Sequence, residues 1–143
     1  MPFRLNPSDF REGLELFNTA RFFEAHEVLE DLWRGLPGDR PSRKHLQGLV
    51  QMAVAFHHWT TGNIEGSRSV LERALRNLTA AESSLPDIDL GRLRSEAEAW
   101  LRYLEHLQHI KSGLATAGRV TDFADATPPL PVIRWRSMKD SAL

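Results

Sequence analysis

Apolar residues recur every three or four positions along most of the chain, which is the spacing of one face of an α-helix. Segments rich in proline, glycine and serine interrupt this pattern, and no stretch shows sustained strand alternation with turn dipeptides between two runs. The pattern therefore predicts an all-α fold of five helices. The expected ranges are residues 8–19, 21–34, 41–61, 63–81 and 89–113.

Several residues at the expected ends of these helices suit helix boundaries. Pro41 suits a first turn, where the N–H that proline lacks has no helical partner anyway. Asn63 and Asp89 can each accept a hydrogen bond from a backbone N–H in the helix that follows. Gly62 suits a helix end, because glycine adopts the left-handed conformation without strain.

A weak internal repeat links the second and fourth predicted helices. RFFEAHEVLEDLWR, residues 21–34, aligns with NIEGSRSVLERALR, residues 63–76, at an offset of 42 residues. The identical positions are Val28/Val70, Leu29/Leu71, Glu30/Glu72 and Arg34/Arg76. Two helical hairpins related in this way predict antiparallel, tetratricopeptide-like packing around a shared core.

The last part of the chain, residues 119–143, departs from the helical pattern. Its PPLP segment favours an extended, polyproline-like course, and apolar residues follow it. These residues are Leu130, Val132, Ile133 and Trp135. We expect a helical domain over residues 1–118 and an extended tail over 119–143 that packs on this domain or on a partner. That partner is a second copy of the chain, in a homo-oligomer, or another protein.

Composition narrows the classes of function. The chain has 143 residues, 41% of them hydrophobic, a net charge of −1 and no cysteine. This charge provides no overall field for nucleic acid or an anionic membrane, so neither is an expected partner. The absence of cysteine excludes disulfides and thiolate metal sites. The apolar run LQGLVQMAVAFHHW is too short to span a bilayer. The opening MPFRLNPSDF lacks the apolar region of a signal peptide, so we expect a cytoplasmic protein.

The second predicted helix carries polar residues beside its apolar face. His26, Glu30 and Trp33 fall at positions i, i+4 and i+7, so they share a stripe with Phe22 and Leu29. From this pattern we expect Trp33 to be largely buried beside these two apolar residues. A histidine and a carboxylate one turn apart on such a face require a chemical explanation.

The third predicted helix has a similar stripe. Gln47, Gln51 and His58 lie on one side of a helix that is apolar on nearly every other side. A buried amide without a partner costs roughly 1–3 kcal/mol, so these side chains need hydrogen-bond partners. If the second and third helices pack antiparallel, His26 and Glu30 are the expected partners.

Three chemical roles fit these residues. In the first, His26 and Glu30 bind a divalent metal such as zinc with His58 as a third ligand, because i, i+4 spacing points two side chains toward one place. In the second, the residues form a hydrogen-bond network that fixes helix packing. In the third, the His–Glu pair performs acid–base chemistry in an enzyme such as a metal-dependent hydrolase. The residues expected to line a small-ligand site are Trp33, Gln47 and Gln51.

Common catalytic motifs give no further assignment. The sequence contains no HExxH, ExxH, GxxxxGK[ST], GxGxxG or GxSxG pattern. These patterns mark zinc proteases, di-iron carboxylate proteins, nucleotide-binding proteins and α/β-hydrolases. The sequence therefore leaves open whether the protein is an enzyme.

Two segments resemble a known family. FNTARFFEAHEVLEDLWR and LQGLVQMAVAFHHWTTGNIEGSRSVLERAL are similar to the family called domain of unknown function number 309, found in bacteria and archaea. The resemblance covers about residues 14–80, and His26, Glu30 and Trp33 carry its HxxxExx(W/Y) signature. It implies a small all-helical cytoplasmic protein whose signature has been proposed to bind metal, and it implies no established reaction.

Together these features predict a protein of unassigned function with a polar cleft between the second and third helices. The leading interpretation is a divalent-metal or small-ligand site in this cleft. The main alternative is a helical-hairpin protein-interaction module in which His26 and Glu30 only fix the packing of the core. A metal-dependent hydrolase is the third interpretation.

Overall fold

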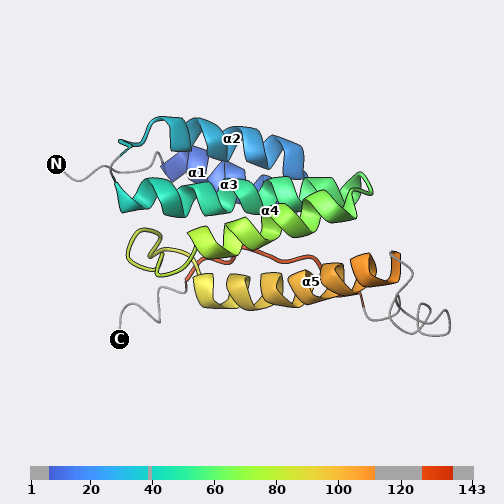
Figure 1. Ribbon diagram of the computed structural model, residues 1–143. Coiled ribbons are helices and arrows are strands. Elements are labelled where there is room, and N and C mark those ends of the chain that lie inside the picture. Colours follow the sequence, from blue (N-terminus) through green and yellow to red (C-terminus); the bar gives the residue numbers. More distant parts are fainter. Residues whose placement is uncertain (1–6, 39, 112–126, 137–143) are drawn as a thin grey trace.

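The computed structural model describes residues 7–38, 40–111 and 127–136, and five α-helices account for most of them (Figure 1). The helices are α1 (Pro7–Asn18), α2 (Phe22–Arg34), α3 (Pro41–Thr60), α4 (Ile64–Asn77) and α5 (Leu90–Lys111). Within the described residues, β-structure is limited to one isolated antiparallel bridge between Ile88 and Trp135. The prediction of an all-α fold with five helices is confirmed.

Three helices begin where their boundary residues predict. Pro41 occupies the first turn of α3. The Asn63 side chain accepts a hydrogen bond from the backbone N–H of Gly66 at 2.8 Å, which caps α4. Asp89 accepts one from the backbone N–H of Arg92 at 3.1 Å at the start of α5. These caps satisfy N–H groups that have no partner inside the helix.

Helix α4 ends at Asn77, so the prediction that it continues to Ala81 is wrong. The chain leaves the helical conformation at Ala80, which has a φ of 58°. Leu78 and Ala81 are nevertheless fully buried, and the Ala81 N–H donates to Leu78 O at 3.3 Å. The apolar periodicity therefore continues into a tight buried turn, which explains the wrong boundary. The predicted end of the fifth helix, near residue 113, lies outside the described residues.

Each helix packs against the next one along the chain, from α1 to α5. Short connections join α1 to α2 and α3 to α4, and the helices of each pair run antiparallel (Figure 1). Helix α3 lies between α2 and α4, which is consistent with its many buried residues. The predicted antiparallel hairpins are present.

The α1–α2 and α3–α4 hairpins turn through the same backbone geometry. Ala20 and Gly62 occupy equivalent positions, with φ values of 65° and 82°. The first turn has four backbone hydrogen bonds from an N–H group to a carbonyl. They run from Thr19 to Glu15, from Ala20 to Phe17, from Arg21 to Leu16 and from Ala25 to Arg21. The second turn has the equivalent four bonds, from Thr61 to His57, from Gly62 to Trp59, from Asn63 to His58 and from Ser67 to Asn63. Each of these donors and acceptors is shifted by the 42-residue offset of the sequence repeat, so the two turns share one backbone geometry.

Aromatic side chains from four helices meet at Phe56 of α3. Its ring lies 6.3 Å from that of Phe17 in α1, 5.7 Å from Phe22 in α2 and 5.3 Å from Trp100 in α5. All four side chains are almost fully buried. Offset and edge-to-face ring pairs of this kind add to the stabilisation that burial provides.

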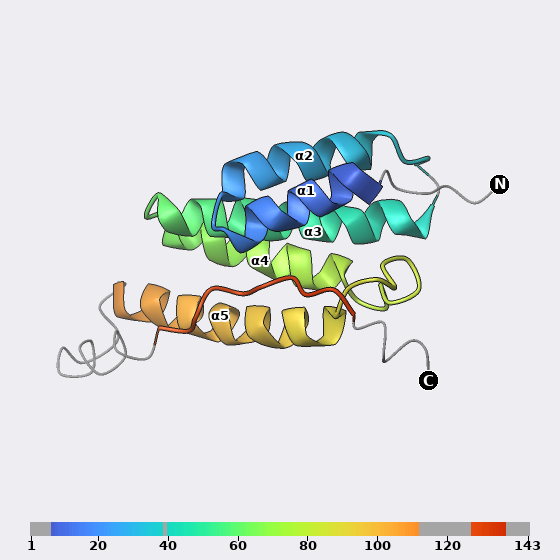
Figure 2. The same ribbon diagram turned by 180° about the vertical axis from the view of Figure 1, so that it is seen from behind.

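Residues 127–136, which we call the strap, run in an extended conformation along α5 and beside α1 (Figure 2). Ile133 is 1% exposed, whereas Trp135 is 41% exposed with its ring 5.9 Å from that of Phe10. This part of the predicted tail therefore packs on the helices, and the rest of the tail lies outside the described residues. Of the five described helices, none combines the length and apolarity needed to cross a bilayer.

Candidate functional site

The predicted site on α2 lies at the edge of the buried face. Phe22 and Leu29 are buried, and Ala25 lies between them as the third buried residue of the helix. The side chains of His26 and Glu30 are 25% and 28% exposed. The polar stripe is therefore reached by solvent.

Trp33 is partly buried and packs against the hydrophobic core. The guanidinium carbon of Arg43 lies 4.0 Å from the centre of a Trp33 ring. Arg43 Nη1 also donates to the carbonyls of Trp33 at 3.2 Å and Leu36 at 2.8 Å, near the end of α2. Trp33 lies in the last turn of α2, where an arginine from α3 stacks on its ring.

Glu30 is the centre of a network of polar side-chain contacts on α2. Its Oε2 lies 2.7 Å from His26 Nε2, and its Oε1 accepts a hydrogen bond from Arg34 Nη2 at 3.1 Å. Both oxygens of the carboxylate are therefore engaged by side chains one turn away in each direction. The sequence prediction that these groups meet follows from i, i+4 spacing within one helix.

The second hairpin repeats this network with a different residue at one position. Glu72 Oε2 lies 2.9 Å from Arg68 Nη1, and Glu72 Oε1 lies 3.2 Å from Arg76 Nη1. Glu72 and Arg76 are equivalent to Glu30 and Arg34, and Arg68 is equivalent to His26. The imidazole of His26 thus occupies the place of a guanidinium in an ordinary helix-surface network.

The polar stripe of α3 has partners other than those expected. Gln51 Oε1 accepts a hydrogen bond from Asn77 Nδ2 of α4 at 2.7 Å. His58 Nδ1 lies 3.3 Å from Asn63 Nδ2 in the hairpin turn. Gln47 is partly exposed. The expectation that His26 and Glu30 serve as the partners of Gln51 is therefore wrong, because α4 supplies the partner instead.

These positions determine what the site can hold. Within the described residues, which include His26, Glu30 and His58, no group of three or more histidines and carboxylates is arranged to bind a metal ion. The structure joins His26 to Glu30 and places His58 against the hairpin turn. The three-ligand site is therefore not formed, and metal binding by the His26–Glu30 pair stays a prediction.

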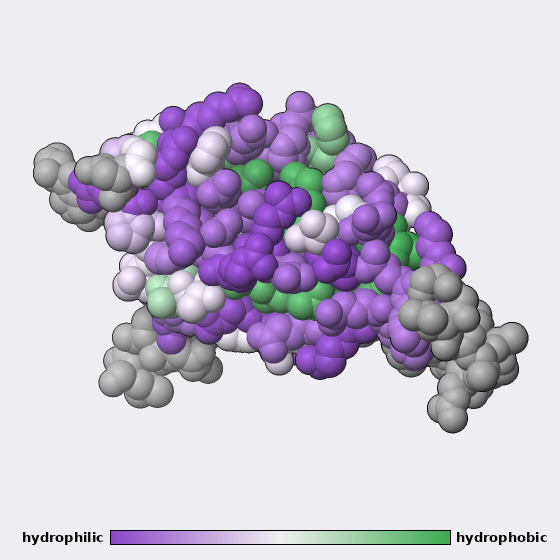
Figure 3. Space-filling view, in the orientation of Figure 1, coloured by the Kyte–Doolittle hydropathy of each residue, from purple (hydrophilic) through white to green (hydrophobic). Residues whose placement is uncertain are grey.

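An exposed aromatic residue beside this pair was missed by the sequence analysis. Phe23 is 48% exposed, and its ring centre lies 5.8 Å from that of His26 and 5.3 Å from that of His57. Phe23 directly follows the buried Phe22, and consecutive residues of a helix point about 100° apart, so this spacing is the signal that could have placed Phe23 outside the buried face. Figure 3 shows that the side of the molecule formed by α2, α3 and α4 is mostly hydrophilic, with small hydrophobic areas.

The sequence analysis also missed the histidine with the clearest electrostatic signal. His45 of α3 is 8% exposed, and its Nδ1 lies 2.6 Å from Ser84 Oγ in the loop before α5. Burial, and secondarily the charge of Lys44, lowers the pKa of His45, while Glu82 opposes this shift. This contact anchors the α4–α5 loop to the beginning of α3.

Comparison with known proteins relates the chain to a family without an assigned function. Residues 10–70 match the family described as "Domain of unknown function (DUF309)". An uncharacterized protein of Aquifex aeolicus (strain VF5) is 32% identical over 88 residues, which are 62% of this chain and 26% of that protein. The uncharacterized protein YpuF of Bacillus subtilis (strain 168) is 29% identical over 101 residues, which are 69% of this chain and 58% of that protein.

The chain thus spans less than two thirds of the length of either relative. The matched residues contain most of α1, all of α2 and α3, and the polar stripe with His26 and Glu30. Neither relative has a name that states an activity. The resemblance to the domain of unknown function 309 family that the sequence predicts is thus supported over residues 10–70.

Proposed function

We propose that this protein is a helical-hairpin protein-interaction module in which His26 and Glu30 belong to a structural network of polar side-chain contacts. The similarity of the two hairpins carries this proposal, because Arg68 and Glu72 of α4 form the same contact as His26 and Glu30 of α2. Because an arginine makes the equivalent contact in α4, a metal is not needed to explain the pairing of His26. Arrays of helical hairpins bury a core between neighbouring helices and offer long surfaces that bind other polypeptides.

The composition supports a protein partner in the cytoplasm. A net charge of −1 gives no overall attraction to nucleic acid or to anionic membranes. A chain without cysteine is suited to a reducing compartment, where disulfides are rare. The proposed partner is either a different protein or a second copy of this chain.

A divalent-metal or small-ligand site at His26 and Glu30 is the second candidate function. The 2.7 Å contact between a nitrogen and a carboxylate oxygen, both partly exposed, favours it. This pair would leave the remaining coordination positions of an ion to water or to a partner. A metal-dependent hydrolase would rest on the same two residues.

Site-specific photo-crosslinking in cells of the source organism tests the interaction module. The photoreactive residue benzoylphenylalanine replaces Phe23 on α2, Arg73 on α4 or Leu130 in the strap, all three of which are exposed. We expect at least one position to give a discrete crosslinked protein that persists when Glu30→Gln is introduced. Absence of a product at all three positions would contradict the module. A product that disappears with Glu30→Gln would favour the metal site.

A further inference from the structure

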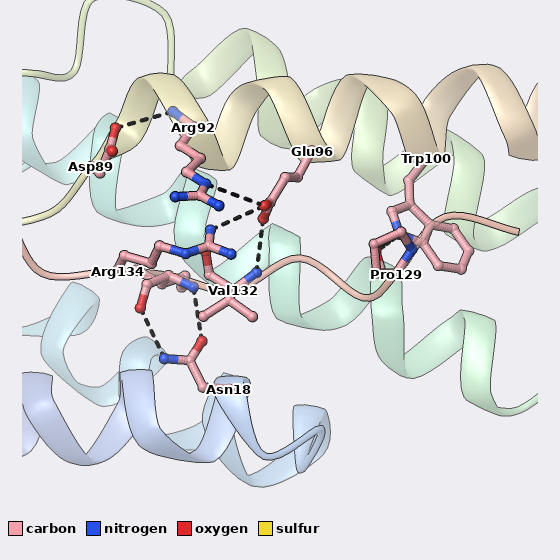
Figure 4. Close-up of polar contacts among 9 residues, drawn as sticks. Asn18, Asp89, Arg92, Glu96, Trp100, Pro129, Val132 and Arg134 are labelled. Atoms are coloured by element: carbon pink, nitrogen blue, oxygen red, sulfur yellow. Dashed lines mark hydrogen bonds and ion pairs between the residues drawn. The ribbon is translucent and has the colours of Figure 1, made fainter.

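The strap is held on the helices largely through its backbone (Figure 4). The side-chain amide of Asn18 in α1 binds both backbone groups of Ile133. Its Oδ1 accepts from Ile133 N, and its Nδ2 donates to Ile133 O, each at 2.8 Å. The indole N–H of Trp100 in α5 donates to Pro129 O at 2.8 Å. These contacts would recognise any extended chain at these positions, because they involve backbone atoms.

The loop before α5 binds the end of the strap in the same way. The Asp89 N–H donates to Arg134 O at 2.8 Å, and the Arg136 N–H donates to Asp87 O at 2.8 Å. These bonds flank the isolated bridge between Ile88 and Trp135. The end of the strap is thus held by main-chain hydrogen bonds on both sides of one isolated bridge, and main-chain bonding is one way in which domains bind extended peptides.

The carboxylate of Glu96 on α5 binds both the backbone and a side chain of the strap. Glu96 Oε1 accepts from Val132 N at 3.1 Å, and Glu96 Oε2 accepts from Arg134 Nη1 at 3.0 Å (Figure 4). The Nε of Arg92 lies 3.7 Å from the same Oε2. The side chains of Glu96 and Arg134 are 25% and 32% exposed, so water screens this pair only in part. A basic residue at this position is therefore selected by charge.

The side chains of the strap alternate between burial and exposure. Pro131 and Ile133 are buried, whereas Leu130 and Trp135 are 39% and 41% exposed. The guanidinium carbon of Arg11 lies 5.3 Å from the centre of a Trp135 ring. Main-chain pairing supplies affinity in such complexes, and pockets for alternate side chains supply specificity.

We infer that the surface of α1 and α5 beneath the strap is a recognition site for an extended segment of a partner protein. The strap is its resident occupant. The matching segment has proline two residues before an aliphatic residue, which is followed by a basic and then an aromatic residue. This inference rests on the proposed interaction function, because it names the kind of segment that the module binds.

The strap is suited to exchange for such a segment. Its contacts are noncovalent, and the groups that bind it belong to α1, α5 and the loop at residues 87–89. If the strap left the site empty, the indole N–H of Trp100 would lose its partner and a buried surface would meet water. A partner segment with the same extended backbone and the same alternation of side chains gives the indole N–H of Trp100 a partner again and covers the exposed surface. Replacement is therefore favoured over an empty site.

Fluorescence anisotropy tests the inference on the full chain, with a labelled decapeptide, TPPLPVIRWR, that has the sequence of the strap. In the wild-type chain the strap occupies the site. The apparent affinity for the peptide is therefore reduced in proportion to the fraction of molecules whose site is free. The Ile133→Asp chain places a charge in the apolar position and releases the strap. We expect it to bind the peptide at least about tenfold more tightly than wild type does. Circular dichroism verifies its helices, and Arg134→Glu is a milder alternative if Ile133→Asp does not fold.

A charge reversal tests the recognised chemistry. The Glu96→Arg chain should repel its own strap and prefer a peptide in which glutamate replaces the arginine equivalent to Arg134. A peptide with aspartate in place of the isoleucine equivalent to Ile133 should bind neither the Ile133→Asp chain nor the Glu96→Arg chain. Equal binding of the arginine and glutamate peptides to both chains would overturn the chemistry that we assign to the segment.

The two proposals fail in different ways. If no peptide binds saturably to either folded variant, the inferred site is wrong. Crosslinks from Phe23 or Arg73 would then still support an interaction module that uses a different surface. If peptides bind as expected but crosslinking finds no cellular partner, the surface binds extended segments of this chemistry, but the proposed interaction function fails and with it the assignment of a partner protein.

Discussion

At the scale of single residues, Glu30 and Glu72 form a matched pair that tests the role of His26. Each carboxylate joins two basic side chains across partly exposed contacts. Ion pairs of this kind contribute about 0–1 kcal/mol. We therefore expect Glu30→Gln and Glu72→Gln each to lower the free energy of unfolding by less than about 1 kcal/mol in urea denaturation.

Calorimetric titration of zinc, manganese and nickel into chelator-treated protein completes this comparison. The interaction module predicts no stoichiometric binding that depends on Glu30. A metal site would behave differently, because carboxylates bind such ions better than neutral amides. One ion bound per chain by wild type and Glu72→Gln but lost in Glu30→Gln would establish the metal site.

Ser67 is a second residue at which the repeat provides a comparison. Its side chain is fully buried in α4, and its hydroxyl has no hydrogen-bond partner within the described residues. The equivalent residue in α2 is the buried Ala25. A buried polar group without a partner costs about 1–3 kcal/mol, so Ser67→Ala should raise the free energy of unfolding by about 1 kcal/mol. In the control, Ser69→Ala at a partly exposed position should change it by less than about 0.5 kcal/mol.

The lowered pKa of His45 makes stability depend on pH. Between this lowered pKa and the ordinary value of 6.5, the unfolded chain binds more protons at His45 than the folded chain does. The contribution of His45 is therefore complete above pH 6.5 and is lost as the pH falls through the folded-state pKa. Urea denaturation at pH 7.5 and 5.5 should show a larger loss for wild type than for His45→Gln. Equal losses would contradict the assignment, since both proteins share the other histidines.

At the scale of helices and turns, Ala20 and Gly62 occupy the same left-handed position in two equivalent hairpins. An L-residue other than glycine is strained there by roughly 1–2 kcal/mol. Gly62→Ala should therefore lower the free energy of unfolding by about 1 kcal/mol, and Ala20→Gly should raise it or leave it unchanged because glycine costs more entropy on folding. Thermal or urea denaturation measures both. Destabilisation by Ala20→Gly as large as that by Gly62→Ala would show that the turns differ.

The same elements show which features can be predicted from sequence. The caps at Asn63 and Asp89 and the contact of His26 with Glu30 are local, since each joins residues within one turn of helix. The partner of Gln51 depends on which helix packs beside α3, and this information lies outside its own helix. A periodic pattern gives the faces of the helices but not their neighbours, so the local half of the site was predictable and the tertiary half was not.

At the scale of the whole molecule, the strap connects α1 to α5, the first and last helices of the described residues. Its contacts with Asn18 and Glu96 join α1 and α5, which are not neighbours in the sequential packing of the helices. The apolar residues of the tail predicted that it would be covered. The site that covers it could not be predicted, because the site exists only after α1, α5 and the loop at residues 87–89 have come together.

Ile133 is the residue through which this long-range packing is best measured. It is 1% exposed and has both backbone groups bound by Asn18, whereas Leu130 in the same strap is 39% exposed. Truncation of a buried isoleucine to alanine typically costs about 2–5 kcal/mol. Ile133→Ala should lower the free energy of unfolding by about 2 kcal/mol or more in urea denaturation, while Leu130→Ala should change it by less than about 0.5 kcal/mol. Equal effects of the two substitutions would show that the strap contributes little to stability, because its buried and exposed positions would then be equivalent.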